Sequence, residues 1–157
     1  MTRARDLADG ADKDITGTLT TDGLTVAGNV SVDGGTIKLD GNHPTNTGNV
    51  ALGDTALDSL TSANFNTGIG HQALTSATSG GNNTALGASA GEGLTTGQFN
   101  AFSGRAAGDA TTSGSYNSAF GAGALGSNTT ASNNTAVGFN ALTTNTTGTQ
   151  NVAVGYK

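Results

Sequence analysis

The sequence has few of the features on which most protein classes depend. None of its 157 residues is a cysteine, which excludes disulfide bonds and thiol chemistry. No apolar run approaches the roughly 20 residues that a membrane-spanning helix needs. Lysine and arginine together number six, against eleven aspartates and glutamates, and this balance argues against nucleic-acid binding.

Large apolar side chains are also scarce. Leucine, isoleucine, valine and phenylalanine supply 27 residues, about 17% of the chain, which is too little for a conventional globular core. Glycine, threonine, alanine and asparagine instead make up 92 residues, about 59%. Disordered chains share such a composition but usually carry a high net charge, and here the net charge is −5. Another regularity must therefore organise the chain.

That regularity is a repeat of 17 residues, which we number as positions 1 to 17 starting from Asn49. Position 1 is always asparagine and position 5 is always glycine, over seven repeats without an insertion. The asparagines are Asn49, Asn66, Asn83, Asn100, Asn117, Asn134 and Asn151. The glycines are Gly53, Gly70, Gly87, Gly104, Gly121, Gly138 and Gly155. Because the spacing never varies, we interpret each repeat as one identical structural unit.

The length and composition of the unit predict one coil of a β-solenoid. Small and apolar residues alternate over a few positions and are followed by Gly, Asn, Ser and Thr, a pattern typical of a short strand and a turn, with room for a second strand. Seventeen residues are too few for a pair of helices, and glycine and threonine disfavour helix. Coils stacked at ~4.8 Å would give a rod of roughly 29 Å over six intervals.

Neighbouring positions of the repeat have distinct expected roles. Position 4 carries larger apolar residues, so we expect it to be the inward ladder: Leu52, Ile69, Leu86, Ser103, Phe120, Val137 and Val154. Position 3 is small except at Phe102 and suits close approach to another coil wall or another subunit. Because Phe102 and Ser103 exchange large and small, we expect packing or register to shift there. The asparagines should cap turns and stack their amides, with sugar binding as the alternative, and the glycines should allow the turn.

The front of the chain has a different composition. Residues 1–40 hold seven of the eleven acidic residues and four of the six basic ones. Apolar residues alternate between Ile15 and Leu39 with glycines between them, which predicts three or four short strands over residues 15–40. Such strands could not cover their apolar faces alone, so we infer that copies of the chain join around an axis, as a trimer would. Residues 41–48 read as a linker.

Parts of the chain resemble known fibrous proteins. Residues 134–142, Asn-Thr-Ala-Val-Gly-Phe-Asn-Ala-Leu, resemble repeats of tail and head fibres of tailed bacteriophages, notably those of marine cyanobacteria. They are also similar to the head repeats of trimeric autotransporter adhesins, which coil as a left-handed parallel β-roll. Residues 17–30 resemble shaft segments of phage fibres. The resemblance implies an all-β fibrous homotrimer, in which a short intertwined β shaft (15–40) leads into a β-solenoid or β-roll of seven repeats (49–157), the last incomplete.

The resemblance also implies a role for the first residues. The stretch from Arg3 to Asp9 is similar to one that often precedes such shafts. Residues 1–14 are therefore expected to attach the fibre to the virion, and the residues carried over for this contact are Arg3, Arg5, Asp6 and Leu7.

Few side chains could support catalysis or ligand binding. Glu92 and Asp109 share position 10 in adjacent coils, and paired carboxylates at ~4.8 Å backbone separation could hydrolyse glycosides or hold Ca²⁺. We interpret them as solvated turn residues, and His71 as an outward residue that forms no metal site. Exposed aromatic rings could stack on sugars, but we interpret the aromatics of position 17 as buried spacer packing: Phe65, Phe99 and Tyr116.

A threonine-rich solenoid could also bind ice, but the threonine pairs of the later repeats have no matching row of threonines in the earlier repeats.

From these side chains we expect no enzyme activity, no catalytic residue, no cofactor and no metal. The sequence predicts a structural phage fibre that projects from the virion and supports host-surface attachment. Its expected partners are further copies of itself as a homotrimer, other virion proteins at the N-terminus and host-surface glycan at the distal tip, with no nucleic acid and no membrane insertion. The alternative is a carbohydrate-binding or depolymerising surface adhesin of a bacterium or phage.

Overall fold

Each repeat folds into one coil that contains a single strand of three residues. The computed structural model describes residues 47–157, so the expected attachment segment, the shaft and nearly all of the linker lie outside the described residues. The strands are β1 (Val50–Leu52), β2 (Thr67–Ile69), β3 (Thr84–Leu86), β4 (Ala101–Ser103), β5 (Ser118–Phe120), β6 (Thr135–Val137) and β7 (Val152–Val154). The rest of each coil runs through turns, and the second strand for which the repeat has room does not form.

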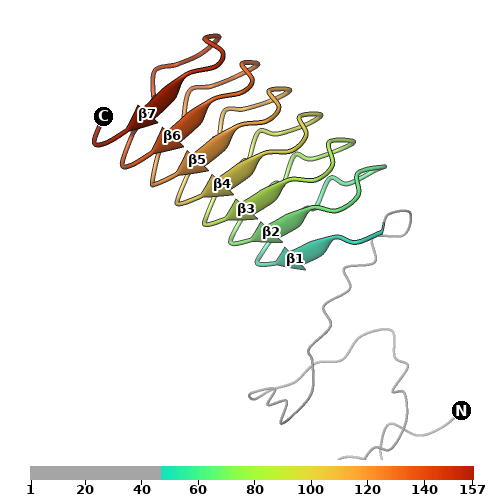
Figure 1. Cartoon of the computed structure of the whole chain (residues 1–157). Coiled ribbons are helices and arrows are strands. Elements are labelled where there is room, and N and C mark those ends of the chain that lie inside the picture. The colour runs from blue at the N-terminus through green and yellow to red at the C-terminus, as the bar shows by residue number, and fades with distance from the viewer. Residues whose placement is uncertain (1–46) are drawn as a thin grey trace, which may run out of the picture. The chain divides into compact units, whose positions relative to one another are not determined.

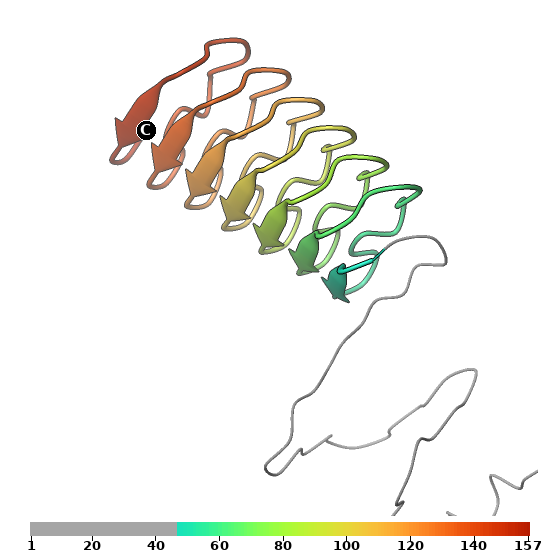
Figure 2. The same ribbon diagram turned by 45° about the vertical axis from the view of Figure 1, so that its right-hand side comes forward.

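The seven strands form one parallel sheet in the order of the chain. Each residue of the strands β1 to β6 pairs with the residue 17 positions further on, for example Val50 with Thr67 and Thr135 with Val152. Figure 1 shows the strands side by side along one wall, with the turns of each coil on the other side, and Figure 2 shows the same stack after rotation. The predicted all-β solenoid of 17-residue repeats is confirmed, and residues 47–157 contain no helix.

The interior of the coil is lined by position 3, and the prediction that position 4 points inward is wrong. Ala85, Ala119 and Ala136 at position 3 are fully buried, whereas Leu52 and Leu86 at position 4 are 53% and 50% exposed. The cause is the narrow interior, which is already filled by leucines of position 9. A Cβ placed on Gly68, at position 3, would lie 3.1 Å from Cγ of Leu57. Only a small inward residue therefore fits opposite such a leucine.

The fourth repeat keeps its register although its large and small residues are exchanged. Phe102 pairs with Ala85 on one side and with Ala119 on the other, so the expected register shift does not occur. The packing does change, because Phe102 is buried and position 9 is Gly91 and Gly108 in the two coils that it contacts. The missing leucines make room for the ring.

Candidate functional site

The asparagines of position 1 form a continuous hydrogen-bonded ladder inside the coil. In each of the six intervals the backbone N–H of one asparagine donates to the side-chain oxygen of the asparagine one coil earlier, at 2.9–3.0 Å. The Nδ2 of Asn66, for example, donates to the carbonyl of Gly80 at position 15 of the same coil, at 2.9 Å. Asn66, Asn83, Asn117 and Asn134 are completely buried. These amides serve the backbone and offer nothing to a sugar.

The glycines of position 5 lie where the chain turns away from the strand and two coils meet closely. Gly104 has φ +132°, and a Cβ on it would lie 2.6 Å from the carbonyl carbon and oxygen of Gly121 in the next coil. Both the conformation and the contact therefore require glycine at this position.

The threonines of position 13 form a second hydrogen-bonded ladder, which the pairs of adjacent threonines in the sequence do not reveal. Position 13 is threonine in all six complete repeats: Thr61, Thr78, Thr95, Thr112, Thr129 and Thr146. The hydroxyls of the first five donate to the carbonyl oxygen of the threonine in the following coil, at 2.9–3.3 Å. The invariance of the position was the available signal. Because these hydroxyls bond to backbone, they are not a free array for ordering water.

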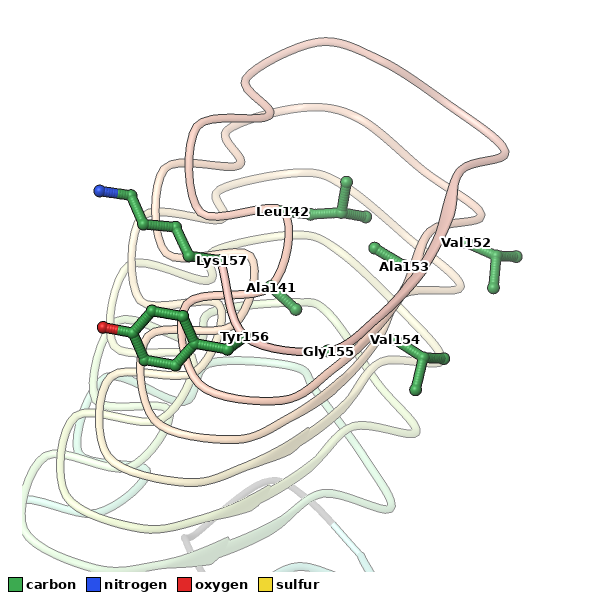
Figure 3. Close-up of a pocket in the computed structure, with 8 residues that line it drawn as sticks. All are labelled: Ala141, Leu142, Val152, Ala153, Val154, Gly155, Tyr156 and Lys157. Carbon is green, nitrogen blue, oxygen red and sulfur yellow. The ribbon is translucent and has the colours of Figure 1, made fainter.

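The residues of position 4 form an apolar line on the outside of the sheet, which we call the outer ladder. Its members are Leu52, Ile69, Leu86, Ser103, Phe120, Val137 and Val154. Phe120 is 46% and Val154 is 76% exposed. Figure 3 shows the alternation at the last strand, where Ala153 points into the coil and Val152 and Val154 point away from it. A strand only three residues long thus places its larger side chains in solvent.

The aromatic side chains of position 17 are exposed, so the expectation of buried spacer packing is wrong. Phe65 and Tyr116 are 61% and 59% exposed, and Phe99 is 47% exposed. The rings of Phe99 and Tyr116 are stacked, with centroids 5.1 Å apart and planes 7° from parallel. Their backbone lies at the corner of the coil and has positive φ. A second stacked pair, Phe139 and Tyr156, belongs to position 6.

Two acidic residues of position 10, Glu92 and Asp109, lie close enough for their charges to interact. Burial raises the pKa of Asp109 above its ordinary value, the N–H of Ala110 opposes this shift by donating to the carboxylate at 3.1 Å, and Glu92 adds a smaller upward effect. Residues 47–157 contain no group of three or more His, Asp or Glu side chains that could hold a metal ion. His71 lies 3.8 Å from Asp54, but both side chains are largely exposed, so the contact is weak.

A hollow of about 370 Å³ lies at the last coil. It is lined by Ala141 and Leu142 and by the residues from Val152 to Lys157. Figure 3 shows that most of these residues are aliphatic and that the Tyr156 hydroxyl and the Lys157 amine point outward from the coil. The lining therefore has no paired acid and base with which to catalyse a reaction.

The comparisons with known proteins do not add a relative. The chain matches no family model, no curated protein and no solved structure. Among the residues that the structure describes, no helix is long and apolar enough to cross a membrane. Arg3, Arg5, Asp6 and Leu7, the expected attachment residues, lie outside the described part of the chain. The features that stand out are thus the asparagine and threonine ladders, the glycines of position 5, the outer ladder and the exposed aromatic residues.

Proposed function

We propose that this chain is a subunit of a homotrimeric phage fibre, in which the solenoid is a stiff rod that supports attachment to a host surface. The observation that carries the proposal is the outer ladder. Six of its seven residues are apolar, and they lie one above another along a parallel sheet with constant register. Soluble monomers rarely expose contiguous apolar patches of this kind, so a partner surface is expected.

Copies of the same chain fit this surface well. A second copy has the same spacing of ~4.8 Å per coil, so each apolar residue of one ladder can meet one of the other along the whole rod. Three copies around one axis would cover every ladder and leave no unmatched face. The polar turns of the coil would remain in solvent.

The rod itself has the internal bonding that a mechanical element needs. The asparagine and threonine ladders and the sheet join every coil to the next by hydrogen bonds along three separate lines. A force along the rod is then shared among many bonds. The proposed mechanism is that several such fibres project their tips together, and that weak contacts to host-surface glycan add up through multivalency.

Light scattering on the full chain tests the assembly directly. We expect three times the monomer mass of 15.2 kDa, and a well-folded monomer would overturn the trimer.

Imaging of a phage particle labelled with an antibody to this chain tests the location. We expect the label along a fibre and none inside the particle. An absence of label from every fibre would contradict the virion assignment.

A depolymerising adhesin is the second candidate, since Glu92 and Asp109 lie in adjacent coils. This candidate predicts cleavage of a host polysaccharide by the full chain and its loss in a Glu92→Gln, Asp109→Asn variant. The fibre proposal predicts no cleavage by either protein. Release of reducing ends from a capsular polysaccharide preparation is the measurement.

A further inference from the structure

The aromatic residues of position 17 lie on strained backbone. All six residues at this position have φ between 56° and 61°, including Phe99 at 56° and Tyr116 at 58°. The backbone is fixed by the preceding coil, because the N–H of Tyr116 donates to the carbonyl of Gln98 at 3.0 Å. Asparagine occupies this region at lower cost than an aromatic residue, and Asn82 and Asn133 do so in neighbouring coils. The rings therefore add strain that the fold does not require.

The rings also gain little from burial. Tyr116 is 59% exposed and Phe99 is 47% exposed, whereas Phe102, which does belong to the core, is 1% exposed. An asparagine serves the same backbone corner without exposing an apolar ring. Strained side chains that do not stabilise the fold are typical of binding sites.

The stacked pair presents flat surfaces that a ligand can reach. Phe99 and Tyr116 cover one face of each other, so the second face of each ring is turned toward an adjoining coil. In those two coils position 17 is Asn82 on one side and Asn133 on the other, whose side chains are shorter than a ring, and Phe99 and Tyr116 remain 47% and 59% exposed. Neither amide makes a side-chain hydrogen bond in the described part of the chain. Each therefore offers a donor and an acceptor next to an open ring face.

The surroundings of the pair select a neutral ligand. Positions 13 to 17 contain no charged residue in any repeat and are rich in Ser, Thr, Asn and Gln. A sugar ring has a C–H face that packs on an aromatic ring and hydroxyl groups that bond to amides and hydroxyls. A stacked nucleobase would need cations for its phosphate, and this surface has none.

We propose that the Phe99–Tyr116 stack, flanked by Asn82 and Asn133, is a binding site for a neutral saccharide on the side of the rod. The site does not depend on the fibre assignment or on the trimer. It would give the rod a lateral contact to glycan in addition to any contact at its tip.

Saturation-transfer NMR on the full chain tests the site, because the method detects millimolar binding. The probes are linear hexasaccharides of α-1,4-glucose, β-1,4-glucose and N-acetylglucosamine. We expect transfer from the protein to at least one of them, and an affinity about tenfold or more weaker for Phe99→Asn, Tyr116→Asn. Asparagine already occupies this position in other coils, so the variant should fold. Absence of transfer to all three probes would overturn the proposal.

Two further variants separate a specific site from general stickiness of aromatic residues. Asn82→Phe with Asn133→Phe adds two rings, but it covers the outer faces of Phe99 and Tyr116 and removes both flanking amides, so binding should be weaker. The matched control, Phe139→Ala with Tyr156→Ala, removes the other stacked pair, which does not lie on positive-φ backbone. This control should bind as the original does. Stronger binding after covering the faces, or equal loss in the control, would contradict the site. So would a change of oligomeric mass without a change of binding in the Phe99→Asn, Tyr116→Asn variant, since the pair would then be a subunit contact.

Discussion

Phe102 shows how single residues adjust to a narrow interior. In most coils a leucine at position 9 fills the space in front of a small residue at position 3. In the third and fourth repeats position 9 is glycine, and a Cβ on Gly91 or Gly108 would lie 2.8 or 2.6 Å from the ring of Phe102. The single ring of Phe102 thus packs against both glycines, where other coils have a leucine. The sequence shows that Phe102, Gly91 and Gly108 depart from the repeat pattern in neighbouring coils. It does not show that they touch, because their contact requires position 3 to point into the coil.

Replacing Phe102 with alanine should therefore leave a cavity that no neighbour fills. We expect a loss of about 3–5 kcal/mol in the free energy of unfolding, measured by urea denaturation. Adding Gly108→Leu to this variant should recover a substantial part of the loss, because leucine occupies position 9 with similar φ in other coils. Gly108→Leu alone should destabilise through its clash with the ring. If the two changes prove additive, Phe102 and Gly108 do not share this space.

Asp109 provides a test by pH. Burial raises its pKa, so the folded protein disfavours the charged form. The carboxylate thus lowers stability at neutral pH, and the penalty disappears as the pH falls below the unfolded pKa near 3.8. Asp109→Asn should be slightly more stable than the original at pH 7, by about 0.5 kcal/mol or less, and equally stable near pH 3. Thermal melts at both pH values are the measurement, with the exposed Asp58→Asn as matched control. A larger gain at pH 3 than at pH 7 would contradict the assigned cause.

At the scale of the coil, the period was readable from the sequence and the direction of the strand residues was not. Asn49 and its six counterparts are 17 residues apart, and this spacing alone predicts seven strands, parallel pairing and constant register. The direction of position 4 depends on the width of the coil interior, which only the packed structure reveals. Larger apolar residues generally face inward, and this rule favours position 4 over position 3. The rule fails here because the narrow interior accepts only a small residue at position 3 opposite the leucine of position 9.

The glycines of position 5 offer a matched pair of substitutions. Gly104→Ala places a Cβ 2.6 Å from the backbone of Gly121, whereas a Cβ on Gly155 meets nothing within 4 Å. Both residues have positive φ, +132° and +139°, so both variants pay the conformational strain, about 1–3 kcal/mol. Only Gly104→Ala must also separate two coils, so it should lose clearly more stability in urea denaturation. Equal losses would show that conformation alone requires the glycine.

At the scale of the whole molecule, residues 47–157 divide their side chains between two tasks. The buried asparagines and the more exposed threonines of position 13 join coils along the rod through hydrogen bonds to the backbone. Some larger apolar residues, such as Leu74 and Phe102, fill the interior, but others lie on the outer ladder, where a monomer gains little from them. The scarcity of large apolar residues in the sequence therefore has a physical explanation if the hydrophobic contribution to stability lies between subunits.

Charges placed on the outer ladder should then abolish assembly without unfolding the coil. Leu86 and Val137 lie three coils apart, are 50% and 37% exposed, and make no demand on the interior. In the variant Leu86→Lys, Val137→Lys, assembly would require the ammonium groups of neighbouring copies to lose their water together. Light scattering should therefore show the mass of the monomer, while the circular dichroism spectrum stays unchanged. Ala88→Lys with Ser127→Lys adds the same charge at exposed positions off the ladder and should keep the trimer mass. A trimer in both variants would show that the copies meet through another surface, and a monomer in both would attribute the effect to net charge.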